Sequence, residues 1–253
     1  MTEHYIEERN LSVAWARAVQ LATAAGRAEL TPLVVAVTGF DPAGDFEEEA
    51  GVRKALDDVL ATAGKQPVTT VANTIFPLSL WNPAADRSAL FKRYQSITPR
   101  LRRKNRYGMY FERMISGGPK TEPNQLDFAI NTYLSRKGAR RSVLQVGVFN
   151  PALDHSAAAL RGFPCLQHVS FAPTKEGLQV NAFYAMQYLV ERAYGNYVGL
   201  CRLGRFAAHE MKLPLIRMTC FTGIAKCDLP KNKLDGVASA LRLALGSPAD
   251  PGK

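Results

Sequence analysis

The chain has 253 residues, 47% of them hydrophobic, which is enough for one sizeable core and argues against a disordered chain. No stretch approaches ~18 uninterrupted apolar residues, and the polar start MTEHYIEERN lacks an apolar signal segment, so we expect neither a transmembrane helix nor a secretory signal. The net charge of +10 favours an anionic partner, and the four cysteines, whose spacing does not suit a metal, are typical of reduced thiols in a cytoplasmic protein.

The first half of the chain predicts helices that alternate with short strands. Apolar residues at helical spacing predict helices over 10–28, 46–65 and 85–97, and β-branched runs predict strands over 30–39 and 66–77. We expect Asn10 or Ser12 to cap the first helix, and Pro99 to follow the end of the third. The densest basic run, 99–106, is either a solvated loop or a segment that recognises an anion.

The second half continues the alternation. The patterns predict helices over 121–138, 196–211 and 231–245, and strands over 142–150, 166–173, 176–186 and 214–223. A turn over 174–177 is expected to pair two of these strands. Together the elements predict an α+β (α/β layered) domain, with a mixed β-sheet flanked by helices.

Several segments of this half resemble thymidylate synthase, in the order in which that family has them. They are QLDFAINTYLSRKGARR (125–141), FNP (149–151), RGFPCLQHVSF (161–171), GLQVNAFYAM (177–186) and NYVGLCRLGRFAAHEM (196–211). Tyr107-Gly108 is similar to the family's tyrosine-glycine pair. The resemblance implies one thymidylate-synthase-like domain over 1–253 whose sheet face is used for dimerisation. Within it, 1–106 is divergent, 107–245 matches best and 246–253 is a flexible tail.

The resemblance implies transfer of one carbon to C5 of a pyrimidine nucleotide, by methylation or hydroxymethylation, with 5,10-methylenetetrahydrofolate as cofactor and no metal. Because C5 is a weak nucleophile, a thiolate must first add at C6. Cys165 matches the family's nucleophile. It needs nearby positive charge to ionise, which Arg140, Arg141 or the run 99–106 would supply. The alternative is a small buried core cysteine.

Other matched positions carry their own alternatives. Asn196 is expected to bind the pyrimidine amide edge or to cap the helix that follows. Arg140 and Arg141 resemble the pair that binds the nucleotide phosphate of the partner subunit in a homodimer, and the alternative is a surface pair. Tyr107 is expected to pass a proton near C5 or to pack as an aromatic residue against the sheet.

The sequence also departs from the family around the cysteine. Leu166 stands where the family has a histidine; His168, two positions on and expected on the same strand face, either substitutes for it or is an ordinary sheet histidine. Ala185 and Met186 stand where the family has its own-chain phosphate arginine and serine, and Arg192 and Arg202 are candidates to replace this phosphate contact.

Further departures affect the folate and sugar contacts. Tyr188 replaces an aspartate that touches the folate ring, and no Asp or Glu occurs between Asp58 and Asp86, where the general base belongs. Asp228 follows the position of the sugar-binding residues but differs from them in type. Three hypotheses remain: an active transferase, a catalytically inactive homologue that binds a nucleotide or a partner protein, and, less favoured, a nucleic-acid binder.

Overall fold

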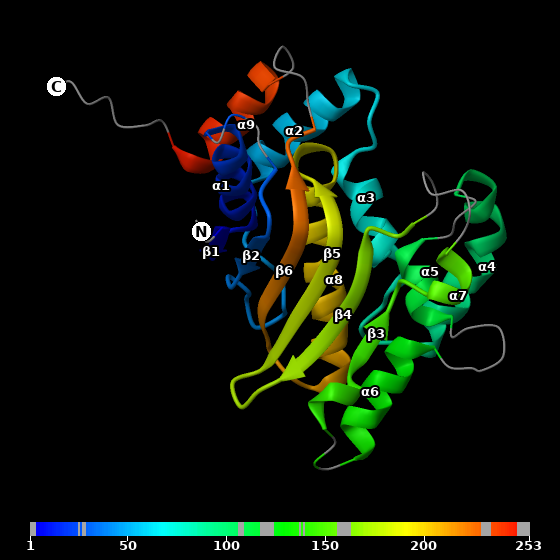
Figure 1. The fold of residues 1–253 in the computed structure, drawn as a ribbon. Coiled ribbons are helices and arrows are strands. Elements are labelled where there is room, and N and C mark those ends of the chain that lie inside the picture. The colour runs from blue at the N-terminus through cyan, green and yellow to red at the C-terminus, as the bar shows by residue number, and fades with distance from the viewer. Residues whose placement is uncertain are drawn as a thin grey trace.

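A computed structural model describes residues 4–24, 26, 29–105, 109–116, 124–136, 138, 140–155, 163–228 and 234–246. It confirms the predicted α+β architecture, with one mixed sheet flanked by helices (Figure 1). The strands are β1 (His4–Glu8), β2 (Leu33–Val37), β3 (Gln145–Gly147), β4 (Leu166–Pro173), β5 (Leu178–Tyr188) and β6 (Leu215–Lys226). They form a six-stranded sheet in the order β1-β2-β6-β5-β4-β3.

Two parallel pairs, β1–β2 and β5–β6, organise this sheet. Each needs a crossover helix, because parallel strands cannot be joined by a tight turn. The α1 helix (Leu11–Ala24) connects the first pair, and the α8 helix (Tyr194–Met211) connects the second. The two units meet where β2 runs antiparallel to β6. Both crossover helices contact the sheet and each other, so the core lies between them and the strands.

The remaining helices cover these crossovers or the β3 edge. They are α2 (Ala50–Thr62), α3 (Val68–Ile75), α4 (Ser88–Lys104), α5 (Tyr110–Ile115), α6 (Gln125–Ser135), α7 (Pro151–Asp154) and α9 (Leu234–Leu245), with short turns at Leu78–Leu80 and Arg141–Val143 and a π-helix, η3 (Leu189–Ala193). The α3 helix packs closely on α8 at Gly195 and Gly199, where an added Cβ would lie within 3 Å of α3 atoms. This contact places α3 beside the start of α8.

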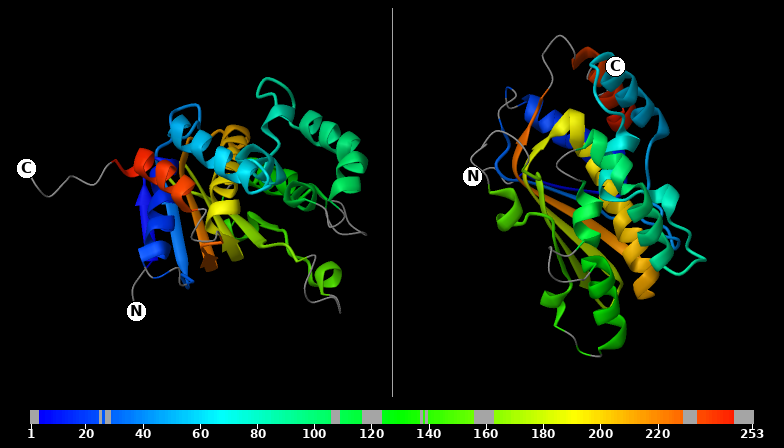
Figure 2. Two further views of the ribbon diagram at one scale, coloured as in Figure 1. Left: turned by 90° about the horizontal axis from the view of Figure 1, so that it is seen from above. Right: turned by 90° about the vertical axis from the view of Figure 1, so that its right-hand side faces the viewer.

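The opposite face of β4, β5 and β6 carries no helix among the described residues along its central part, as the view onto these strands shows (Figures 1 and 2). Large apolar side chains remain exposed on β5 and β6. Phe183 is 40% exposed, Phe221 38% and Ile224 37%. The rings of Phe183 and Phe221 lie 5.5 Å apart, on neighbouring strands in register. The sheet therefore has one covered face and one apolar open face.

The strand predicted over 66–77 is wrong, because this segment forms α3. Val68, Val71, Ala72 and Ile75 are buried, at the spacing of a helix face that packs on α8. The Asp57 carboxylate accepts a hydrogen bond from the Val68 N–H at 2.7 Å and satisfies one free donor at the helix start. Packing thus overrides the β propensity of the valine and threonine residues.

The predicted helix end before Pro99 is also wrong, since α4 continues to Lys104. Pro99 has no N–H, so the carbonyl of Gln95 loses its hydrogen bond within the helix. Both residues are exposed, and water can therefore bond this carbonyl instead. The turn over 174–177 is confirmed, with the Thr174 N–H bound to the Gly177 carbonyl at 2.8 Å. The β1 strand, α5 and η3 were not predicted.

Candidate functional site

A cavity of about 460 Å³ opens where α3, α5, the start of β4, the end of β5 and the start of α8 meet. We call it the Cys165 cavity. Its lining brings together five residues named from the sequence: Cys165, Met186, Tyr188, Arg192 and Asn196. The residues that sequence reasoning did not assign and that also line it include Tyr110, Gln187 and Arg113. The segment around Cys165 is anchored by a hydrogen bond from the Ala185 N–H to the Cys165 carbonyl at 3.0 Å.

Cys165 is the one exposed cysteine of the four in the chain. Desolvation by the cavity wall raises the pKa of its thiol, while the positive charge of Arg192 and a hydrogen bond from Tyr110 oppose that rise. The alternative of a buried core cysteine is therefore wrong. The cation that acts on the thiol is Arg192, and neither Arg140 nor Arg141 is among the residues that line the cavity. With its pKa raised, the thiol is mainly protonated at neutral pH while the cavity is empty.

Tyr110 lies against this thiol from the first turn of α5. Burial raises the pKa of its phenol to about 12, and the nearby Cys165 adds to the rise. The hydroxyl therefore stays protonated at neutral pH and can donate a hydrogen bond to a thiolate. Tyr107, the tyrosine expected from the sequence, lies outside the described residues. The segment NRYGMYFER carries a second tyrosine three positions on, which was the available signal for Tyr110.

Two carboxamides face the same cavity. Asn196 is 4% exposed and lies in the first turn of α8, which follows directly from η3, so its role as an N-cap is wrong. Gln187 is 3% exposed, and its Oε1 accepts a hydrogen bond from the buried Thr222 hydroxyl at 3.3 Å. Among the described residues the Gln187 Nε2 has no hydrogen-bond partner. This nitrogen is enclosed by protein atoms, so an acceptor on a ligand reaches it only when the side chain moves.

His168 does not line the cavity, and its predicted position on the same strand face as Leu166 is wrong. The pairing of β4 with β5 shifts register between these two residues, and this bulge reverses the side on which the later residues lie. Leu166 is fully buried, whereas His168 is half-buried and lies 2.7 Å from Gln145 Oε1 through its Nε2. Burial lowers the pKa of His168, so it is neutral at pH 7. It is a partnered sheet histidine.

Asp228 and Arg202, two further candidates from the sequence, do not line the Cys165 cavity. The Asp228 carboxylate accepts hydrogen bonds from the backbone N–H groups of Val190 at 2.9 Å and Glu191 at 3.1 Å, and so holds the start of η3, which carries Arg192. Burial raises the pKa of this carboxyl. Arg202, considered as a replacement for the phosphate arginine, lines a different cavity.

The charges around the Cys165 cavity are positive but partly compensated. Arg192 is 2.8 Å from Glu191. Arg113 is 2.8 Å from Asp154. No Asp or Glu occurs among the described residues that line the cavity. Within the described part of the chain no cluster of three or more His, Cys, Asp or Glu residues could hold a metal ion, and no helix there is long and apolar enough to cross a membrane.

Comparison with known proteins adds no family to these observations. No protein-family model matches the chain, and no curated protein matches it.

Proposed function

We propose that the protein is a thymidylate-synthase-like transferase that moves one carbon to C5 of a pyrimidine nucleotide. The observation that carries this proposal is the shared cavity of about 460 Å³, in which the one exposed cysteine lies with Tyr110 and the buried carboxamide of Asn196. Cys165 and Asn196, which both match functional positions of thymidylate synthase, line this one cavity although they lie far apart in the chain. The volume is within the range of small-molecule sites.

In this reaction the Cys165 sulfur forms a bond to C6, and the C5–C6 π electrons move to C5 and O4. The enolate carbon then takes a one-carbon unit, which 5,10-methylenetetrahydrofolate supplies. Loss of the C5 proton would break the bond between the transferred carbon and the folate nitrogen and leave an exocyclic methylene on C5. Addition of hydride or water to this methylene would expel the sulfur as thiolate and restore the ring. Methylation and hydroxymethylation share this start and differ in whether hydride or water completes the product. Tyr110 donates a hydrogen bond to the thiolate, and Asn196 and Gln187 bind the edge of the base.

The rest of the lining supports this placement of a nucleotide and a folate. Arg192 is the cation whose charge lowers the pKa of the thiol, and a guanidinium fork suits a phosphate. Tyr188 and Phe163 line the cavity and are 41% and 40% exposed, so both offer flat apolar surface to a folate ring. The additional phosphate contacts, from Arg140 and Arg141, would come from a second subunit.

A homodimer through the open sheet face is part of the proposal. Phe183 and Phe221 form an exposed aromatic pair there, with their rings 5.5 Å apart. Such a patch on a folded protein marks an interaction surface, and a two-fold contact places the same face of both subunits together. Arg140 and Arg141 are exposed in the single chain, as residues that act in a partner's site must be.

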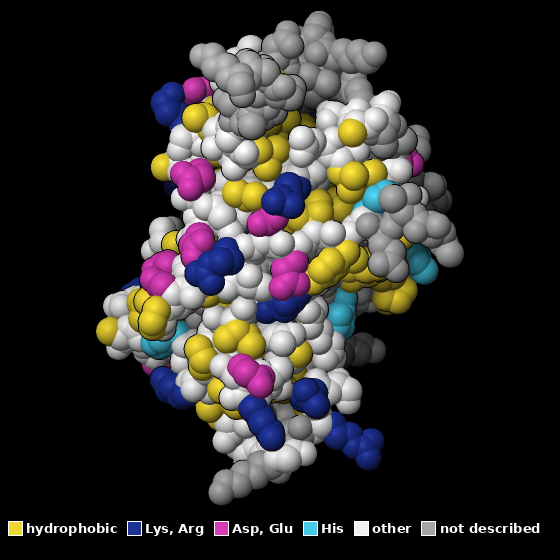
Figure 3. Space-filling view, turned by 90° about the vertical axis from the view of Figure 1, so that its left-hand side faces the viewer, with side chains coloured by type: hydrophobic (Ala, Val, Ile, Leu, Met, Phe, Trp, Pro, Cys, Tyr) yellow, Lys and Arg dark blue, Asp and Glu magenta, His cyan; other side chains and the backbone are white. Residues whose placement is uncertain are grey.

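A second function is favoured by one specific observation. No Asp or Glu is among the described residues lining the cavity, so no carboxylate there acts as a general base, and the Cys165 pKa is raised rather than lowered. Both features fit a protein that binds a nucleotide reversibly without chemistry. A nucleic-acid binder is less favoured, because the sequence carries no nucleic-acid-binding motif. On the face in Figure 3, Lys and Arg side chains are interspersed with Asp and Glu.

One experiment separates the first two functions. The protein is incubated with 5-fluoro-dUMP, with and without methylenetetrahydrofolate, and weighed intact. The transferase predicts a covalent adduct that disappears in Cys165→Ser. Reversible binding of the nucleotide without an adduct, unchanged in Cys165→Ser, contradicts the transferase and supports the binding protein. Steeply salt-dependent binding of DNA or RNA in its place supports the third function.

A further inference from the structure

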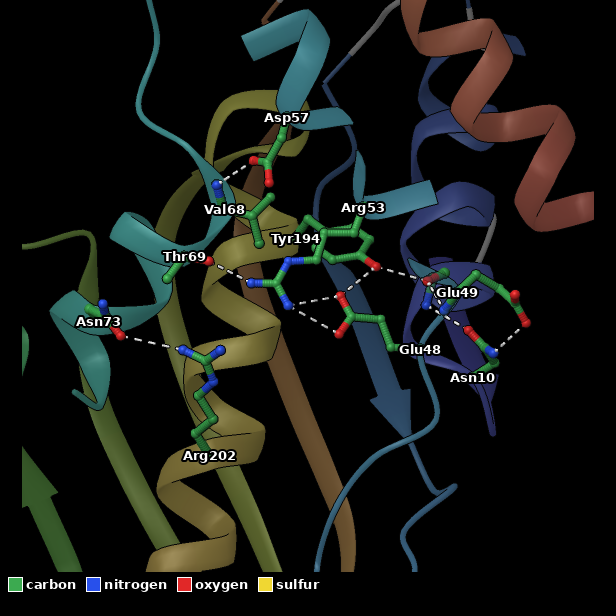
Figure 4. Close-up of polar contacts among 11 residues, drawn as sticks. Asn10, Glu48, Glu49, Arg53, Asp57, Val68, Thr69, Asn73, Tyr194 and Arg202 are labelled. Atoms are coloured by element: carbon green, nitrogen blue, oxygen red, sulfur yellow. Dashed lines mark hydrogen bonds and ion pairs between the residues drawn. The ribbon is translucent and has the colours of Figure 1, made fainter. Parts of the chain in front are cut away.

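A second cavity, of about 320 Å³, lies between the middle of α8, the start of α2 and the segment 44–48. Three arginines line it: Arg53, Arg202 and Arg205. We call it the arginine cavity. It shares no lining residue with the Cys165 cavity, although α3 borders both. Val71 and Thr74 of α3 line the Cys165 cavity, and the side chains of Thr69 and Asn73 contact the arginines (Figure 4).

Two of the three arginines have carboxylate partners. Arg53 Nη1 lies 3.3 Å from Glu48 Oε2, and its Nη2 donates to Thr69 Oγ1 at 2.6 Å (Figure 4). The Glu48 carboxylate also accepts a hydrogen bond from the Tyr194 hydroxyl at 3.0 Å. Arg205 forms an ion pair with Asp45. These two pairs use both carboxylates that line the arginine cavity.

Arg202 is the exception. Its Nη1 donates to the neutral Asn73 Oδ1 at 3.3 Å, and no carboxylate of the described residues lies within ion-pair distance of it (Figure 4). Burial is the main cause that lowers the pKa of this guanidinium, and the like charge of Arg53 lowers it further. The lining therefore holds three cations against two carboxylates, and the unbalanced charge is on a half-buried side chain. A desolvated cation of this kind is stabilised by an anion.

We propose that the arginine cavity binds the phosphoryl group of a small phosphate ester or free phosphate. The guanidinium of Arg202 offers a planar fork that matches phosphate oxygens, and the half-buried Arg53 and Arg205 border the same space. A volume of about 320 Å³ is at the lower end for small-molecule sites, which favours a compact ligand. Phe46 and Leu78 provide apolar walls for the organic part of an ester. This inference does not depend on the proposed transferase.

The test measures binding of inorganic phosphate and of glycerol 3-phosphate by calorimetry and by thermal unfolding, at ionic strength held constant with KCl. We expect Arg202→Gln to weaken binding by roughly tenfold to a hundredfold, because a charge-assisted bidentate contact is lost. Arg103→Gln is the matched control: it removes the same charge from an exposed position on α4 and should bind as the wild type does. Tighter binding of glycerol 3-phosphate than of phosphate identifies an ester as the ligand, and equal affinity identifies free phosphate.

Arg192→Gln separates this site from the Cys165 cavity, where phosphate binding would depend on Arg192. Wild-type affinity in Arg202→Gln, loss of binding in Arg192→Gln alone, or no binding to the wild type each overturns the proposal. Should Arg202→Gln fail to fold, Arg202→Lys decides, because it keeps the charge and loses the fork. Weaker phosphate binding by this variant supports the proposal, and unchanged binding contradicts it.

Discussion

The contact between α3 and α8 allows a quantitative test at Gly195. A methyl group added there would lie 2.6 Å from Val71 Cβ and 2.9 Å from the Val68 carbonyl oxygen. Neither atom is the end of a flexible side chain, so α3 itself must shift. Overpacking of this kind costs about 1–3 kcal/mol, whereas replacing glycine by alanine inside a helix gains about 1 kcal/mol. Because 2.6 Å is closer than Cβ atoms approach in proteins, we place the cost at about 2–3 kcal/mol and expect Gly195→Ala to lower the free energy of unfolding by about 1–2 kcal/mol.

Gly51 provides the matched control, since it lies in α2 and an added methyl would meet only Leu243 Cδ1 at an ordinary 3.7 Å. Gly51→Ala should raise stability by about 0.5–1 kcal/mol. Thermal unfolding should show Gly195→Ala melting roughly 3–6 °C below the wild type and Gly51→Ala slightly above it. Because Val71 lines the Cys165 cavity, Gly195→Ala should also weaken nucleotide binding. Equal stabilisation by the two substitutions would refute the packing of α3 on α8.

Three further outcomes test the Cys165 cavity and the open sheet face. Alkylation of Cys165 by iodoacetamide should rise with pH to a midpoint above that of a free cysteine, because its pKa is raised, and Arg192→Gln should move the midpoint higher and slow alkylation at neutral pH by about two- to tenfold. Gln187→Leu should weaken binding of dUMP by roughly tenfold in calorimetry, and it should also lower the free energy of unfolding by about 1–3 kcal/mol because the buried Thr222 hydroxyl loses its acceptor. Phe183→Asp should shift the protein from dimer to monomer in light scattering, whereas a wild type that is monomeric at micromolar concentration contradicts the proposed interface.

The sequence predicted the sheet and its crossover helices better than the helices that cover them. The β4–β5 hairpin has a turn signal, and α8 has a long apolar pattern, so both are specified locally. The α3 segment has the valines and threonines of a strand, and its helical state depends on the glycines of α8, which are distant in the chain. The six-residue α5 is too short for a periodic pattern to reveal it.

The site residues that the sequence did not predict depend on contacts between distant parts of the chain. Cys165 and Asn196 were expected in one site only through the resemblance to thymidylate synthase, since no local pattern of the strands between them indicates that they meet. Gln187 was not expected there, because the alternation of buried residues along β5 changes phase between Tyr184 and Gln187 and turns the carboxamide inward. The positive charge at the thiol was assigned to the wrong arginines, because Arg192 reaches it only through η3, whose start Asp228 holds. A π-helix leaves no pattern from which that placement could be inferred.

The partners of Arg192 bear on how the empty cavity would respond to a phosphate. Glu191 is largely buried and has two cations, Arg192 at 2.8 Å and Lys65 at 2.7 Å. Removing one partner from a buried carboxylate is costly when it leaves the charge alone, but here Lys65 remains. Arg192 can therefore turn to a ligand phosphate without leaving Glu191 unpaired. The proposed nucleotide would then gain the Arg192 guanidinium as a phosphate contact while Lys65 keeps the Glu191 carboxylate paired.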